Sequence, residues 1–157
     1  MTAHLPVWPF AILAVLLALG YRQSRDRLVQ PLTLVKLAIG MLALSLYGVT
    51  AAFGAQLLPV LAWAAGFAAA LLLADVAFAP RGLAREGAAV RVPGSWLPLG
   101  LMLGIFAAKF GLGFASGVGA PVLGQAWFIA AMSAAFGLFS GAFAARAAAV
   151  QRFVRAA

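Results

Sequence analysis

The chain has 157 residues, of which 66% are hydrophobic and 9% are charged, and its formal net charge is +8 at pH 7. A soluble domain usually carries about 25% charged residues, so a water-soluble protein of this composition would expose large apolar patches and aggregate. The composition therefore excludes an ordinary soluble protein and indicates a membrane protein, and the absence of cysteine excludes disulfides and thiolate chemistry.

Five apolar segments follow one another along the chain, and each is about as long as the roughly 20 residues with which a helix crosses a bilayer. They comprise residues 5–21, 31–53, 57–79, 96–116 and 121–145. Within lipid a helix satisfies its own backbone groups, and the alternating stretches of about ten residues typical of a β-barrel are missing. The sequence thus predicts an all-α bundle of five transmembrane helices that forms a single domain.

The charges between these segments indicate the orientation of the chain. Arginines follow the first, third and fifth segments, whereas the turns after the second and fourth contain neither lysine nor arginine. The positive-inside rule then puts the N-terminus outside and the C-terminus in the cytoplasm. The nine arginines are Arg22, Arg25, Arg27, Arg81, Arg85, Arg91, Arg146, Arg152 and Arg155. Because these arginines lie between the apolar segments, they are expected to set the topology and to contact lipid head groups. The positive net charge therefore predicts a lipid bilayer as partner and no nucleic acid.

Three charged residues fall inside the apolar segments, where ionised groups are usually paired or functional. Lys36 and Asp75 lie roughly 7 Å and 6 Å from the cytoplasmic ends of two adjacent antiparallel helices, at about 1.5 Å per residue. Their common depth predicts a Lys36–Asp75 ion pair. The alternative is that Lys36 alone extends to the cytoplasmic head groups.

Lys109 is the deepest of these charges, roughly 18 Å from the cytoplasmic end of its helix and near the midplane. No carboxylate lies at its depth. Three interpretations follow: a structural charge that reaches Asp75, Tyr47 or helix carbonyls; a ligand-binding residue that lines a polar cavity with Tyr47 and takes an anionic group or relays protons; or a side chain that extends to the outer interface.

The sequence offers little chemistry beyond these charges. It has three carboxylates and one histidine, His4, and shows no hydrolase triad, metal-ligand cluster or phosphate-binding loop. We therefore expect no catalytic residues, no metal, no cofactor and no enzymatic activity.

Two patterns concern packing and evolution. Residues 47–63 and 110–127 align as a weak internal repeat, which predicts a same-direction duplication, and chance similarity in an Ala/Gly/Leu-rich chain is the alternative. Glycines four residues apart occur at Gly100 and Gly104 and at Gly137 and Gly141. Such spacing lets helix backbones approach closely, and we expect contacts within the chain in preference to a homo-oligomer or another membrane protein.

Several stretches together resemble a family of small proteobacterial inner-membrane proteins of unknown function: PVWPF, LGYRQSRDR, SLYG, PGSWLPL, AAKFG and FGLFSG. More distantly, the chain is similar to the small membrane proteins grouped with cytochrome c biogenesis. The resemblance implies a multi-pass protein of the bacterial inner (plasma) membrane, and it implies no substrate.

Two functions fit these observations. We expect a non-enzymatic accessory or assembly component, for which Lys109 is packed or paired and a Gly/Ala face is free to meet another protein. The alternative is a small transporter or binding protein for an anionic or amphiphilic ligand, for which Lys109 borders a cavity with Ser, Tyr or Thr facing it.

Overall fold

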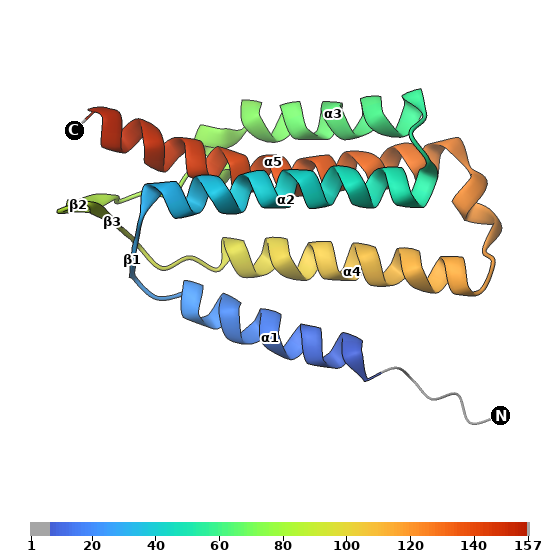
Figure 1. The fold of residues 1–157 in the computed structure, drawn as a ribbon, viewed down its shortest axis with the longest axis horizontal. Helices are drawn as coiled ribbons and strands as arrows, with labels where there is room; N and C mark the ends of the chain where they lie inside the picture. Colours follow the sequence, from blue (N-terminus) through green and yellow to red (C-terminus); the bar gives the residue numbers. More distant parts are fainter. Residues whose placement is uncertain (1–6, 157) are drawn as a thin grey trace.

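The computed structural model describes residues 7–156, in which five α-helices run side by side and a small β-sheet covers one end (Figure 1). The helices are α1 (Trp8–Gln23), α2 (Pro31–Phe53), α3 (Leu57–Leu72), α4 (Leu97–Gly117) and α5 (Ala126–Ala156). A π-helical turn, η1 (Ala74–Phe78), follows α3, and a 3-10 turn, η2 (Pro121–Gly124), precedes α5. The strands are β1 (Arg27–Val29), β2 (Ala84–Glu86) and β3 (Ala89–Val92).

The helices α2, α4 and α5 are long and apolar enough to cross a membrane, and α1 and α3 are shorter apolar helices of 16 residues each. A proline occupies the first or second position of α1, α2 and α4, where a missing N–H group leaves no helical hydrogen bond unmade. Residues 5 and 6 of the first predicted segment lie outside the described residues.

Glycines determine the tightest helix contact, which is between α3 and α5. A Cβ atom at Gly66 would collide with the carbonyl of Ala134, and one at Gly137 would collide with the carbonyl of Trp63. A Cβ at Gly141 would lie 2.8 Å from the Phe67 carbonyl oxygen. The predicted use of the Gly137 and Gly141 pair for packing within the chain is therefore confirmed.

The helices divide into two groups (Figure 1). In the first, α5 packs between α3 and α2, and in the second, α1 packs along α4. At the middle of the molecule, the two groups meet where Phe139 of α5 fills the space beside Gly104 of α4.

The prediction of an all-α fold is wrong in one region. The strands form an antiparallel sheet in the order β1-β3-β2, with Arg27 opposite Val92 and Arg85 opposite Val90. Along β3 the side chains alternate, so that Val90 and Val92 are buried while Arg91 is exposed. The two valines pack against Val150 of α5, and this apolar contact holds the sheet on the end of the bundle.

Two helix ends also differ from the predicted segments. Regular helix stops at Leu72 in α3, short of residue 79, and the remaining residues form the π-helical turn η1. In contrast, α5 continues past residue 145 to Ala156, and its 31 residues make it about 46 Å long at 1.5 Å per residue.

Candidate functional site

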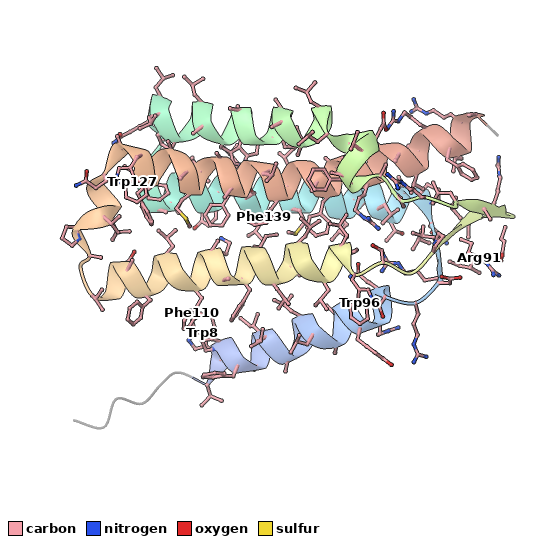
Figure 2. All side chains as sticks on the ribbon, turned by 180° about the vertical axis from the view of Figure 1, so that it is seen from behind. Trp8, Arg91, Trp96, Phe110, Trp127 and Phe139 are labelled. Atoms are coloured by element: carbon pink, nitrogen blue, oxygen red, sulfur yellow. The ribbon has the colours of Figure 1, made fainter. Side chains whose placement is uncertain are left out.

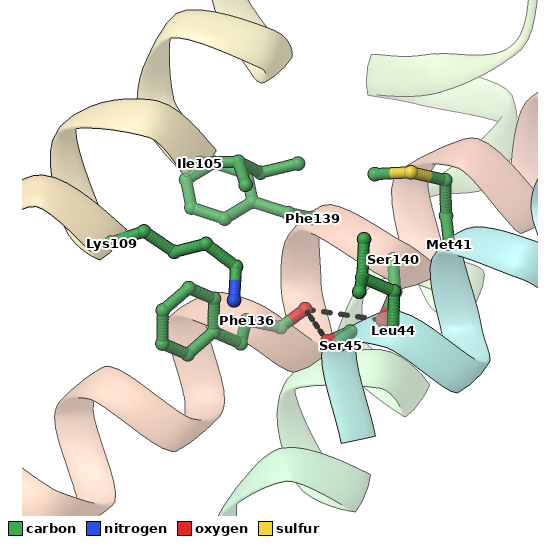
Figure 3. Close-up of a pocket in the computed structure, with 8 residues that line it drawn as sticks. All are labelled: Met41, Leu44, Ser45, Ile105, Lys109, Phe136, Phe139 and Ser140. Carbon is green, nitrogen blue, oxygen red and sulfur yellow. Dashed lines mark hydrogen bonds between the residues drawn. The ribbon is translucent and has the colours of Figure 1, made fainter. Parts of the chain in front are cut away.

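The candidate site is the groove between α4 and the α2–α5 pair, into which Lys109 projects (Figure 3). Its Nζ atom lies over the ring of Phe136 on α5, 5.2 Å from the ring centroid, in a cation–π contact. On the α2 side, a Cβ atom at Gly48 would lie only 2.7 Å from that nitrogen. A glycine at this position therefore leaves the room that the ammonium group occupies.

Two serines bring polar atoms to the floor of the groove. Ser45 Oγ donates to the carbonyl oxygen of Phe136 at 2.9 Å, and Ser140 Oγ donates to the same oxygen at 3.1 Å (Figure 3). Both serines are buried and line a cavity of about 20 Å³ together with Lys109. Within residues 7–156, no hydrogen bond or ion pair to a protein group engages the Lys109 ammonium.

Lys109 also borders two larger hollows. The first, of about 370 Å³, lies among α1, α2, α4 and α5, and every side chain that lines it apart from Lys109 is apolar. The second, of about 430 Å³, is a shallow and largely open depression between α2 and α4, lined by Tyr47, Gly48 and Ser116 among others. The groove thus combines an apolar interior with one cationic group and a few hydroxyls.

The structure brings together the two residues that the sequence nominated for ligand binding. Tyr47 and Lys109 line the same 430 Å³ cavity, from α2 and α4 respectively, and Tyr47 is 70% exposed. No hydrogen bond within the described residues joins the two side chains, so the phenol group is free to take part in binding.

Lys36 and Asp75 are not brought together. Asp75 lies in η1, and its Oδ1 atom accepts a hydrogen bond from Nη2 of Arg152 at 2.8 Å. Among the described residues, no ion pair involves Lys36, which is exposed on α2. The partner that the structure gives to Asp75 therefore differs from the predicted one.

Sequence reasoning missed Phe136, Gly48 and the two serines. In a chain with 12 phenylalanines and 17 glycines, neither residue type stands out at a given position. Ser140 could have been noticed, because it directly precedes Gly141 and shares the small-residue face of α5.

The described residues contain no group of three or more His, Cys, Asp or Glu side chains that could hold a metal ion. His4 lies outside these residues.

The whole chain, residues 1–157, matches the model of a family described as Family of unknown function (DUF6622), and the chain belongs to this family. No curated protein and no solved structure matches the chain. The match confirms the predicted membership of a family of unknown function, and the family description specifies no substrate or partner.

Proposed function

We propose that this member of a family of unknown function is a non-enzymatic, multi-pass protein of the bacterial inner membrane that binds an anionic amphiphile beside Lys109. The observation that carries the proposal is an ammonium group that borders two cavities and an open depression without a carboxylate partner in residues 7–156. A charged side chain at mid-membrane depth costs roughly 2.5 to 3.5 kcal/mol on insertion scales, and such residues often mark ligand or ion pathways. An acidic head group would supply the counter-ion.

In this proposal the chain crosses the membrane five times, with its N-terminus outside and its C-terminus in the cytoplasm. All nine arginines lie in the C-terminal parts of α1 and α5, in the strands or in the segments that connect to them, toward the end where Figure 2 labels Arg91, and the turns at the opposite end carry no lysine or arginine. That asymmetry supports a cytoplasmic sheet. The short helices α1 and α3 are about 24 Å long at 1.5 Å per residue, which local thinning of the bilayer can accommodate.

The lining of the groove supports an amphiphile over a small hydrophilic anion. A cavity of about 370 Å³ lies within the range of about 300 to 1,000 Å³ that small-molecule sites occupy. Its apolar walls match a hydrocarbon chain, and Lys109 at its edge matches one acidic group. A hydrophilic anion would leave its other acceptors facing Met, Leu and Phe side chains, which is unfavourable.

The test compares three proteins in lipid nanodiscs by native mass spectrometry, with and without added laurate. They are the wild type, Lys109→Met and, as a matched control, Lys36→Met, since Lys36 lines none of the three cavities. We expect the wild type and the control to retain laurate or an endogenous acidic amphiphile and the Lys109 variant to lose it. Equal retention by all three folded proteins would overturn the proposal.

A second candidate, the accessory or assembly component, is favoured by free glycines on the outer half of α4. Cβ atoms at Gly113 and Gly117, which are one helical turn apart, would meet nothing within 4 Å. A partner helix could approach closely there.

A leucine at Gly117 distinguishes the two candidates, because it blocks the approach of a helix and leaves Lys109 in place. Loss of a co-purifying membrane protein from folded Gly117→Leu, with amphiphile binding intact, supports the accessory role. An unchanged set of co-purifying proteins contradicts it.

A further inference from the structure

A second cationic region lies at the sheet end, around Arg146 of α5. This arginine is buried, with 9% of its surface exposed, and its Nη1 atom donates to the carbonyl oxygen of Phe78 at 3.2 Å. A guanidinium group carries five N–H donors, and this is the one hydrogen bond that Arg146 makes within the described residues. Among the described residues, Ser133 Oγ is the one fully buried side-chain polar atom without a hydrogen-bond partner, so the nitrogens of Arg146 are not in that class. The other nitrogens of Arg146 have no partner and are therefore not completely enclosed by protein atoms.

Arg146 lines a cavity of about 300 Å³ together with Arg81, Ser95 and Leu97. Nη2 of Arg81 donates to the carbonyl oxygen of Val76 at 3.3 Å. Both arginines are thus held by carbonyl groups of the turn η1, which fixes their guanidinium groups at the wall of one cavity. Most of their donors stay free for another acceptor.

The start of α4 adds positive character to the same cavity. Leu97, its first residue, lines the cavity, and the first turn of α4 contains no acidic residue. The dipole of a helix N-terminus attracts anions, although the N–H group of Leu97 is already bonded to Ser95 and Pro98 has none. Ser95 Oγ accepts a hydrogen bond from the Leu97 N–H group at 3.2 Å, so its own proton is free to be donated.

No carboxylate neutralises these groups. The chain has three acidic residues: Asp75 pairs with Arg152, Glu86 pairs with Arg91, and Asp26 accepts a hydrogen bond from the N–H group of Gly94 at 2.7 Å. Gly94 borders the cavity, but none of the three carboxylates lines it.

A third arginine increases the positive charge. Arg27 and Arg146 together line an adjoining cavity of about 20 Å³, and burial lowers the pKa of Arg27 below its ordinary value. Like charges gathered in this way repel one another, and a bound anion would relieve that repulsion.

We propose that the cavity between Arg81 and Arg146 binds a phosphate group, carried either by an anionic phospholipid or by a soluble phosphate ester. Two guanidinium groups can each donate a pair of parallel hydrogen bonds to phosphate oxygens, and the Ser95 hydroxyl can donate a further one. The site lies at the opposite end of the apolar groove from Tyr47, shares no lining residue with the cavity that contains Tyr47, and does not depend on ligand binding at Lys109.

The test uses the full chain in nanodiscs and measures retention by native mass spectrometry. The probes are phosphatidylglycerol in a phosphatidylcholine bilayer and, separately, glycerol 3-phosphate added to pure phosphatidylcholine nanodiscs. The variant that decides is Arg81→Gln, because Arg81 is exposed and glutamine keeps an N–H donor for the Val76 carbonyl. Arg155→Gln is the matched control, since it removes the same charge from an exposed position outside the cavity. Arg146→Gln is tested in the same way, and its thermal unfolding is measured to check that the variant folds.

We expect Arg81→Gln to weaken phosphatidylglycerol retention about tenfold and Arg155→Gln to change it less than about twofold, because Arg81 lines the cavity and can donate charge-assisted hydrogen bonds to the phosphate, whereas Arg155 lies outside it. The same contrast with glycerol 3-phosphate, in the absence of anionic lipid, would identify a soluble ester as the ligand. Equal weakening by both variants would show general attraction of anions to the surface and overturn the site. Unchanged retention of both probes by folded Arg81→Gln would overturn it as well.

Discussion

The indole Nε1 atom of Trp63 on α3 lies 2.9 Å from the hydroxyl oxygen of Ser45 on α2. The same hydroxyl donates to the carbonyl oxygen of Phe136 on α5, so one buried serine links the three helices of the larger group. Because this link forms the floor of the groove, it keeps the Phe136 ring beneath Lys109.

Replacing Ser45 with alanine should therefore loosen the bundle. The variant loses two hydrogen bonds, and we expect its free energy of unfolding to fall by about 0.6 to 1.7 kcal/mol, which are the average and the maximum measured for hydrogen bonds between membrane helices. Unfolding in mixed micelles with increasing SDS, followed by circular dichroism, measures the change. Thr50→Ala is the control, because Thr50 bonds only to carbonyls of its own helix. An equal loss in both variants would mean that the link between helices adds nothing.

The glycine contacts between α3 and α5 predict a larger effect. In Gly137→Ala the new methyl group collides with the Trp63 carbonyl, and backbone atoms cannot move away as a flexible side chain can. We expect a loss of about 3 kcal/mol, at the upper end of the usual cost of overpacking. Gly111→Ala, where a Cβ meets nothing within 4 Å, should instead be neutral or up to about 1 kcal/mol more stable. Thermal unfolding of the two variants measures this difference. Similar melting temperatures would contradict the close packing of α3 against α5.

The helices were the predictable part of the fold, since a long apolar run reports directly where the chain avoids water. Helix α2 begins and ends at the predicted residues 31 and 53, and α4 is shifted by one residue. The sheet was not predictable in this way, because its strands have three or four residues and are stabilised by contacts with Val150, which is distant in sequence.

The site was predictable where a residue differs from its surroundings. Lys109 stands alone in an uncharged stretch, whereas the neighbours that shape its cavity are ordinary residues of an apolar chain. Depth alone suggested Lys36 as the partner of Asp75. The actual partner is Arg152, because α5 continues as a helix beyond residue 145 and returns this arginine to the side of η1. The burial of Arg146 could not be predicted for the same reason, since this arginine also lies in the part of α5 beyond residue 145.

A double-mutant cycle distinguishes the two possible partners of Asp75. We expect Asp75→Asn and Arg152→Gln to show a coupling free energy of about 0.2 to 1 kcal/mol, since exposed ion pairs contribute little. The side chains are 74% and 60% exposed, so added salt should reduce the coupling. The same cycle with Lys36→Gln should give no coupling. A coupling to Lys36 as large as that to Arg152 would contradict the structure at this end of the bundle.

The proposed orientation predicts which turns can be reached from each side of the membrane. The chain contains no cysteine, so each single-cysteine variant carries one reactive thiol and no background. Gln56→Cys lies in the uncharged turn between α2 and α3, and Ala88→Cys lies in the turn between β2 and β3, and both positions are exposed.

A maleimide that cannot cross membranes should label Gln56→Cys in intact spheroplasts and should label Ala88→Cys only after lysis. The arginines beside Ala88 are the physical reason, because positively charged segments stay on the cytoplasmic side during insertion. Labelling of Ala88→Cys in intact spheroplasts would mean that the orientation is the reverse of the proposed one. The phosphate site at Arg146 would then face the periplasmic leaflet, and the same head-group chemistry would have to be supplied from that side.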